Sequence, residues 1–130
     1  VYAAALWWGS LTTIGFLVVP LLFMHLPTPA LAGGMAAKLF TAQTWMSVAC
    51  GGILLLTSTS KQASAPAQRA HDAIVFILLG MLLALLVEFA VAPRIVTRTN
   101  LKLWHSVGSV MYLVQWLCAA IVFWRITPKQ

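Results

Sequence analysis

The first 24 residues of the chain contain no charged side chain and are mostly apolar. A helix of that length is about 36 Å long, which is enough to cross a hydrocarbon layer about 30 Å thick. Three more apolar runs follow, and only 8% of all residues are charged, whereas a soluble domain has about 25%. So few charged side chains could not cover the surface of a soluble globule. The sequence therefore predicts an integral membrane protein.

The four apolar runs predict four membrane-spanning helices in a single domain that covers residues 1–130. Short connections join consecutive runs, and helices joined in this way pack side by side in antiparallel order. The predicted fold is an all-α, up-down-up-down four-helix bundle in a membrane. The expected spans are residues 1–24, 35–57, 73–92 and 103–124.

The start of the second span carries a helix-capping pattern and a pair of glycines. Thr28 followed by Pro29 is typical of an N-cap with proline at the first helical position. A helix from there to Thr57 would be about 45 Å long, which exceeds the thickness of the hydrocarbon layer. We therefore expect a short interfacial piece that ends in a break or bend at Gly33 and Gly34.

Residues near the other helix ends give further local predictions. Pro20 lies near the end of the first span, where the loss of a backbone hydrogen bond is tolerated. Asp72 precedes the third span and is expected to cap that helix, where its charge suits the positive end of the helix dipole. Four tryptophans are expected at the membrane interfaces, which aromatic rings favour: Trp7, Trp8, Trp104 and Trp124.

With four spans, the N-terminus, the polar linker of residues 58–70 and the C-terminus share one side of the membrane, which we call the linker side. Basic residues are divided evenly between the two sides, so the positive-inside rule gives no orientation. The linker side holds Lys61, Arg69, Arg125 and Lys129, and the opposite side holds Lys38, Arg94, Arg98 and Lys102. Basic residues expected upstream of Val1 favour cytoplasmic N- and C-termini.

Polar residues within the spans are concentrated near the side opposite the linker. Ionisable groups inside a membrane normally face the interior of the bundle, because contact with lipid is costly. We therefore predict a polar binding pocket at this end of the bundle. Its members are Lys38, Glu88, Arg94, His105 and Ser109, and the basic residues Arg94, Arg98 and Lys102 are expected to contact lipid headgroups.

Glu88 is the most informative member of this pocket, because an ionised group in a span costs about 2.5 kcal/mol or more at the membrane centre. It follows Gly80 and Ala84 at four-residue intervals, so a ridge of small residues would carry it into a helix contact. One interpretation is a buried ion pair with Lys38, Arg94 or Arg98, which would fix the helix register. The other is a proton- or ion-coupled role.

Histidine and cysteine side chains are weaker candidates for metal binding. His25 and His105 lie near the same membrane face and are possible ligands, although an interfacial histidine is the commoner role. Cys50 and Cys118 lie within apolar runs, where cysteine usually packs as a small buried hydrophobic side chain. We therefore expect no metal and no cofactor.

The sequence lacks the short motifs of common catalytic sites, including nucleophile elbows, zinc-binding helices and phosphate-binding loops. The net charge of +6 comes from basic residues scattered at the ends of apolar runs. That pattern is typical of membrane topology and headgroup contact, and not of nucleic-acid binding. We expect neither an enzyme nor a nucleic-acid-binding protein.

Short motifs along nearly the whole chain resemble the transmembrane protein 205-like family, a bacterial family catalogued as domain of unknown function 4149. The motifs are Leu6-Trp7-Trp8-Gly9, Val19-Pro20-Leu21-Leu22-Phe23, Ala32-Gly33, Lys38-Leu39-Phe40, Ala92-Pro93-Arg94 and Leu103-Trp104-His105-Ser106. The resemblance implies a four-helix protein of the bacterial cytoplasmic membrane, and it implies no established biochemistry. Its motif positions carry over to Pro20, Phe23, Gly33, Lys38, Phe40, Pro93, Arg94 and His105.

These patterns favour a non-enzymatic accessory or scaffolding subunit of a larger membrane complex, in contact with lipids and with other integral membrane proteins. An alternative is a protein that binds or transports a small molecule, a lipid or an ion through the polar pocket. A third interpretation is a metal- or haem-binding membrane protein.

Overall fold

The computed structural model describes residues 2–58, 65–91, 93–94 and 101–127 of the chain. Within these residues every regular element is helical, and four helices are long and apolar enough to cross a membrane. The predicted all-α membrane fold is confirmed, and the protein is a multi-pass membrane protein. The four spans are Tyr2–His25, Pro29–Ser58, Ile74–Val91 and Lys102–Ile126.

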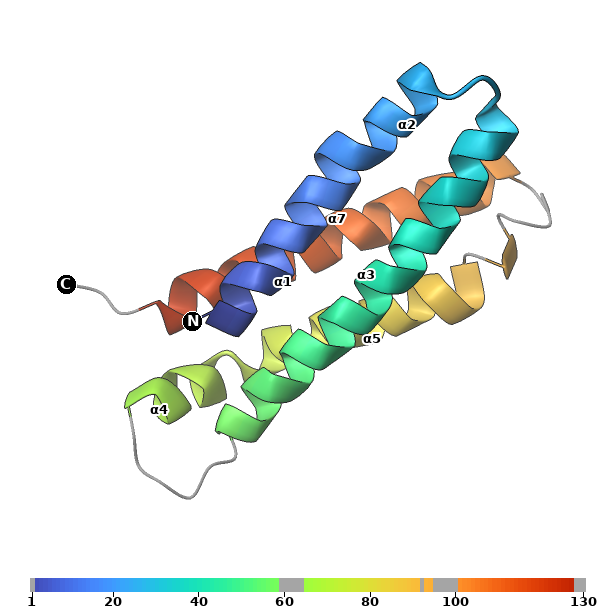
Figure 1. The fold of residues 1–130 in the computed structure, drawn as a ribbon. Helices are drawn as coiled ribbons and strands as arrows, with labels where there is room; N and C mark the ends of the chain where they lie inside the picture. Colours follow the sequence, from blue (N-terminus) through green and yellow to red (C-terminus); the bar gives the residue numbers. More distant parts are fainter. Residues whose placement is uncertain (1, 59–64, 92, 95–100, 128–130) are drawn as a thin grey trace.

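The four spans form an antiparallel bundle in which each helix packs against two neighbours (Figure 1). The first span consists of α1 (Tyr2–Thr13), η1 (Ile14–Val18) and α2 (Val19–His25), and the second is α3 (Pro29–Ser58). The third consists of α5 (Ile74–Leu86) and η2 (Val87–Val91), and the fourth is α7 (Leu101–Ile126). The start of α1 and the end of α7 lie at the same end of the bundle as the short helix α4 (Ala65–Asp72), as an even number of spans requires (Figure 1).

Pro20 lies inside the first span, and a π-helical turn just before it keeps the helix continuous. Proline has no backbone N–H, so an α-helix loses one hydrogen bond at that position. At the end of η1 the Val19 N–H donates to the carbonyl of Ile14, five residues back, in place of the usual four. The widened turn accommodates the proline, and the span continues to His25.

The predicted break at Gly33 and Gly34 is wrong, because α3 runs without interruption from Pro29 to Ser58. Thr28 caps its start as predicted: the side-chain oxygen of Thr28 accepts the N–H of Leu31 at 3.2 Å. A glycine inside a helix costs about 1 kcal/mol relative to alanine, which weakens the helix without breaking it. At about 45 Å, α3 is longer than the hydrocarbon layer is thick, so it tilts or extends beyond that layer.

Asp72 does not cap the third span as predicted. It is the last residue of α4, and Ala73 takes the N-cap position of α5 without a side-chain hydrogen bond. The Asp72 carboxylate instead accepts a hydrogen bond from Gln68 within α4, at 3.0 Å. The prediction failed because part of the polar linker is itself helical, and α4 packs against α3 and α7.

Trp7 is completely buried, contrary to the prediction that its ring lies at the interface. Gly80 of α5 lies directly against the ring: a Cβ added to Gly80 would be 2.6 Å from Trp7 Cη2. The ridge of small residues on α5 therefore faces the bundle interior, where it leaves room for an indole. Trp8 is partly covered as well, stacked on Phe123 with ring centroids 5.8 Å apart. Trp124, in contrast, is 69% exposed near the end of α7.

Candidate functional site

Glu88 lies in the π-helical turn η2, where its side chain is half-buried. The hydroxyl of Thr41 on α3 lies 2.9 Å from its Oε1 atom. The face of the third span that carries Gly80 and Glu88 is therefore turned into a helix contact, as the spacing predicted. π-Helical turns are rare in proteins, and those that occur are often found at functional sites. The contact between Glu88 and Thr41 is therefore the centre of the candidate site.

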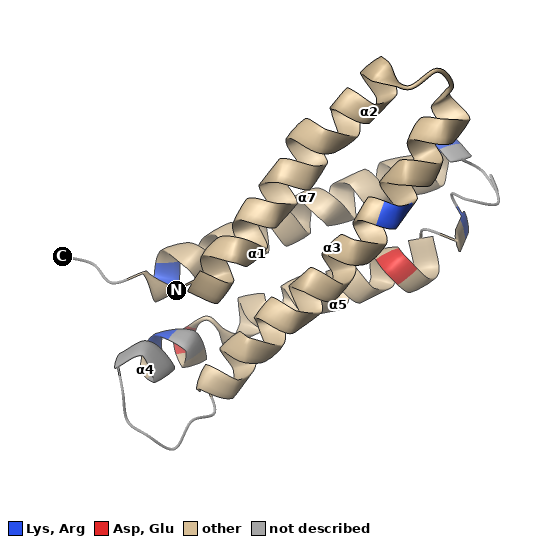
Figure 2. Cartoon of the chain, viewed as in Figure 1, with Lys and Arg blue, Asp and Glu red and all other residues tan. Residues whose placement is uncertain are grey.

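Within the described part of the chain, no basic side chain forms an ion pair with Glu88, whose hydrogen-bond partner is a neutral hydroxyl. Charged residues are sparse along the four spans (Figure 2). Lys38 lies one turn before Thr41 on α3 and is exposed. The guanidinium of Arg94 lies 4.4 Å from the centre of the Trp104 ring, in a cation–π contact. Arg98 lies outside the described residues.

The Thr41 hydroxyl lies between two acceptor oxygens. It is within hydrogen-bond distance of the Ala37 carbonyl at 3.1 Å and of Glu88 Oε1 at 2.9 Å, and its one hydrogen can point to either oxygen or be shared between them. A hydroxyl also accepts hydrogen bonds, so Thr41 can pair with the Glu88 side chain whether or not that side chain carries a proton.

The two remaining members of the predicted pocket lie on the outer face of α7. His105 and Ser109 are both exposed, and the Ser109 hydroxyl donates to the carbonyl of His105 in its own helix at 2.9 Å. Lys102 is exposed near the start of the same helix. The described hydrogen bonds therefore join Glu88 to α3, and they leave His105 and Ser109 outside this contact.

A second polar cluster, which no sequence motif indicated, lies inside the bundle. Gln43 on α3 donates through Nε2 to the hydroxyl of Ser10 on α1 at 3.1 Å and to the hydroxyl of Ser47 at 3.3 Å. The Ser47 hydroxyl donates to Oε1 of Gln115 on α7 at 3.0 Å. These four residues, here called the central network, join the first, second and fourth spans. The four-residue spacing of Gln43 and Ser47 is the one sequence signal that could have revealed it.

The central network leaves a buried acceptor without a partner. Gln43 is 3% exposed, and its Oε1 atom has no hydrogen bond to the described residues. Rotation of the amide would exchange its oxygen and nitrogen but would still leave one buried polar atom unpaired. Such an atom costs about 1–3 kcal/mol when nothing satisfies it. The network therefore has the capacity for one more polar partner, such as a buried water molecule.

The histidine and cysteine candidates do not form a cluster. His25 ends α2 and is exposed, and His105 is exposed on α7. Cys50 and Cys118 are both buried and free, which agrees with a packing role. In the part of the chain that the structure describes, no group of three or more His, Cys, Asp or Glu side chains could hold a metal ion. The metal- or haem-binding interpretation gains no support from this geometry.

The profile of one family, described as "Domain of unknown function (DUF4149)", matches residues 2–103. The match covers the first three spans and the start of α7. The chain belongs to the DUF4149 family. No curated protein and no solved structure gives a match to it.

The DUF4149 match contains the contact between Thr41 and Glu88, whereas His105, Ser109 and Gln115 lie beyond its last residue. The family description names no activity for a DUF4149 protein. The side chains of Thr41 and Glu88 place one protonatable carboxyl, with a hydroxyl partner, between the second and third spans.

Proposed function

We propose that this DUF4149 protein is a non-enzymatic accessory or scaffolding subunit of a larger membrane complex, attached to its partner through the outer face of α3. The proposal rests on glycines in the spans that none of the described side chains covers. The partner is another integral membrane protein, and the contact is helix on helix. The membrane is the bacterial cytoplasmic membrane, which the family resemblance supports.

The glycines of the spans fall into two groups according to what lies against them. A Cβ added to Gly51 would be 2.5 Å from Met81, and a Cβ added to Gly80 would be 2.6 Å from Trp7. The second group has nothing within 4 Å of the added Cβ and consists of Gly9, Gly33, Gly34 and Gly52. Glycine weakens a helix by about 1 kcal/mol, and membrane proteins use it where a second helix packs close. The uncovered glycines mark positions that a helix of another protein can approach.

Gly52 belongs to a line of residues along α3 that faces away from the bundle. Ala42, Trp45, Ala49, Gly52 and Leu56 follow one another at alternating intervals of three and four, which places them on one side of the helix. We call this line the outer seam. Trp45 is 55% exposed, and the residues beside it in the seam are small. A partner helix can therefore come close and cover the ring.

Photo-crosslinking in the membrane tests this proposal. A photo-reactive phenylalanine analogue at Ala49 is expected to join the chain to one other membrane protein and to give an adduct of defined mass. The matched control is the same analogue at Leu82, which is 52% exposed on α5 at a similar distance from the linker end of its helix. This position is expected to react with lipid alone. Lipid adducts alone at both positions would show that the outer seam faces the bilayer and would refute the contact.

A second candidate function is the handling of a proton or another small cation at Glu88. The contact with Thr41 supports it, because a hydroxyl can donate to an ionised Glu88 and accept from a protonated one. The charged or titratable side chains described at this end of the bundle beside Glu88 are Lys38 on α3, Arg94 after η2, and Lys102 and His105 on α7. All four are exposed. Carboxyl groups within membrane spans frequently belong to proton or ion pathways, and none of the described side chains forms an ion pair with Glu88.

Replacing Glu88 by glutamine is expected to abolish proton handling and to leave the fold intact. The glutamine amide can donate to Thr41 as a protonated carboxyl does, so the helix contact is kept. In vesicles that contain the purified protein and a pH-sensitive dye, the wild type should take up protons after an acid pulse. The Glu88→Gln variant should show only the leak of empty vesicles, and its infrared spectrum should lack one band of a protonated carboxylic acid.

The control for this experiment is Thr41→Val, which removes the hydroxyl and keeps the shape of the side chain. It is expected to lower the free energy of unfolding by about 0.6 to 1.7 kcal/mol, the range for one hydrogen bond between membrane helices. Proton uptake by Glu88→Gln at the wild-type rate would contradict the second candidate function.

A further inference from the structure

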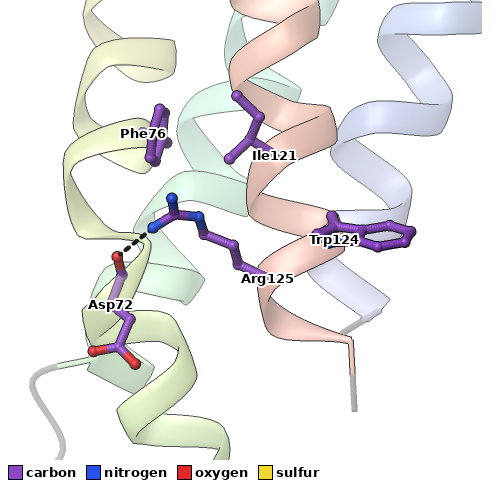
Figure 3. A pocket seen from close by; sticks show the side chains of 5 residues that line it. All are labelled: Asp72, Phe76, Ile121, Trp124 and Arg125. Carbon is purple, nitrogen blue, oxygen red and sulfur yellow. Dashed lines mark hydrogen bonds between the residues drawn. The ribbon is translucent and has the colours of Figure 1, made fainter. Parts of the chain in front are cut away.

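An open depression of about 570 Å³ lies at the linker end of the bundle, at the opposite end from Glu88. Its walls come from α4, α5 and the last turns of α7, and its lining residues are Asp72, Phe76, Ile121, Trp124 and Arg125. Figure 3 shows the Arg125 side chain reaching from α7 toward Asp72 and Phe76. None of these residues belongs to the candidate site described above.

The depression presents one positive and one negative side chain that do not pair with each other. The Arg125 guanidinium donates to the backbone carbonyl of Asp72 at 3.4 Å and lies 4.9 Å from the centre of the Phe76 ring. The Asp72 carboxylate accepts from Gln68 at 3.0 Å and points away from the guanidinium (Figure 3). A guanidinium has five N–H donors and a carboxylate has about four acceptor positions, so each keeps most of its capacity for a ligand.

The surroundings place the depression at the boundary between the hydrocarbon layer and water. Trp124 is 69% exposed near the end of α7, and aromatic rings favour the headgroup level of a membrane. Phe76 and Ile121 form an apolar wall on the membrane side of Arg125 (Figure 3). Asp72 lies on the other side, at the end of the polar helix α4. A ligand here meets charge at one end and apolar surface at the other.

We propose that the depression binds a phospholipid whose headgroup carries both a phosphate and an ammonium group, such as phosphatidylethanolamine. Arg125 binds the phosphate through charge-assisted hydrogen bonds, and the Asp72 carboxylate accepts hydrogen bonds from the ammonium group. The acyl chains lie along Ile121 and Trp124. An anionic lipid without an amine, such as phosphatidylglycerol, would satisfy Arg125 but would bring its negative charge close to Asp72. The site therefore discriminates between the two lipids, whichever function the Glu88 end serves.

Competition between these two lipids tests the proposal. The full chain is purified in detergent with equal amounts of phosphatidylethanolamine and phosphatidylglycerol, and the lipids that stay bound are identified by native mass spectrometry. The wild type is expected to retain phosphatidylethanolamine preferentially. Arg125→Gln should weaken retention of both lipids by about tenfold or more, the loss of one charge-assisted contact of about 1.5–3 kcal/mol.

Asp72→Asn gives the sharper result, because it leaves the phosphate contact in place. The variant is expected to keep total lipid binding and to lose the preference for phosphatidylethanolamine. Excess soluble phosphoethanolamine should not displace the lipid from the wild type, since it has no acyl chains. Three results would overturn the proposal: equal retention of the two lipids by the wild type, an unchanged preference in Asp72→Asn, or displacement by soluble phosphoethanolamine, which would make a free metabolite the ligand.

Discussion

Replacing Gly80 by alanine is expected to lower the free energy of unfolding by about 1–3 kcal/mol, a large effect for a single methyl group. The added Cβ would lie 2.6 Å from Trp7 Cη2 and 3.6 Å from the Cβ of Cys118. Trp7 is completely buried, so its ring cannot move aside without displacing a helix. Removing a glycine favours the helix by up to about 1 kcal/mol, but the steric overlap outweighs that gain.

The matched control is Gly9→Ala on α1, where nothing lies within 4 Å of the added Cβ. This variant should have the stability of the wild type or exceed it by up to about 1 kcal/mol. Both free energies of unfolding are measured by denaturant titration of the purified protein in the same detergent. If the two alanine variants were equally stable, Trp7 would not pack on Gly80 and the helix arrangement would be incorrect.

Hydrogen bonds between helices add specificity to this packing. The Tyr112 hydroxyl on α7 donates to the carbonyl of Leu11 on α1 at 2.6 Å, and the Trp116 indole N–H donates to the Thr12 hydroxyl at 2.8 Å. Such bonds contribute about 0.6 kcal/mol each on average in a membrane protein. Their main effect is to determine which faces of α1 and α7 meet, while close packing around Trp7 contributes most of the stability.

The architecture could be predicted from the sequence because lipid imposes a simple rule on it. A span needs about 20 apolar residues, and the four runs that meet this requirement became the four long helices. The cap at Thr28 and the inward-facing ridge at Gly80 also followed from local chemistry and spacing. These features depend on residues close together in the chain, so a sequence pattern is sufficient to identify them.

The partners of the polar side chains could not be predicted, because they depend on how distant helices rotate against each other. The carboxylate of Glu88 meets Thr41, 47 positions away, although three basic residues were equally plausible from spacing. The bond between Ser47 and Gln115 spans 68 positions and has no local signature. The sequence predicts Trp7 at the membrane interface because the residue lies toward the end of its span. Its burial depends on a glycine of another span.

Replacing Gly52 by leucine is expected to detach the proposed partner protein and to leave the isolated chain as stable as the wild type. Gly52 lies in the outer seam with nothing within 4 Å of an added Cβ, so a larger side chain fits the free chain. It would nevertheless hold a partner helix away from Ala49 and Trp45, and close approach is what drives helix association in lipid. The measurement is the amount of partner recovered with the tagged chain from solubilised membranes.

The neighbouring glycine provides the control for this variant. Gly51 is buried, and a Cβ there would lie 2.5 Å from Met81, so Gly51→Leu is expected to lower the free energy of unfolding by about 1–3 kcal/mol. The two adjacent substitutions should therefore have different effects. Gly52→Leu should weaken association with the partner protein, and Gly51→Leu should lower the stability of the fold. Loss of stability in Gly52→Leu, or full recovery of the partner with it, would show that the outer seam is not an interface.

The mass of the wild-type particle in a mild detergent tests the central claim most directly. The chain itself has a mass of 14.1 kDa. The proposed role as an accessory subunit predicts that the protein extracted from its native membrane migrates, after correction for bound detergent and lipid, as a larger complex with a second membrane protein in fixed ratio. Recovery of the protein only as a monomer, under conditions that keep other membrane complexes intact, would contradict that role.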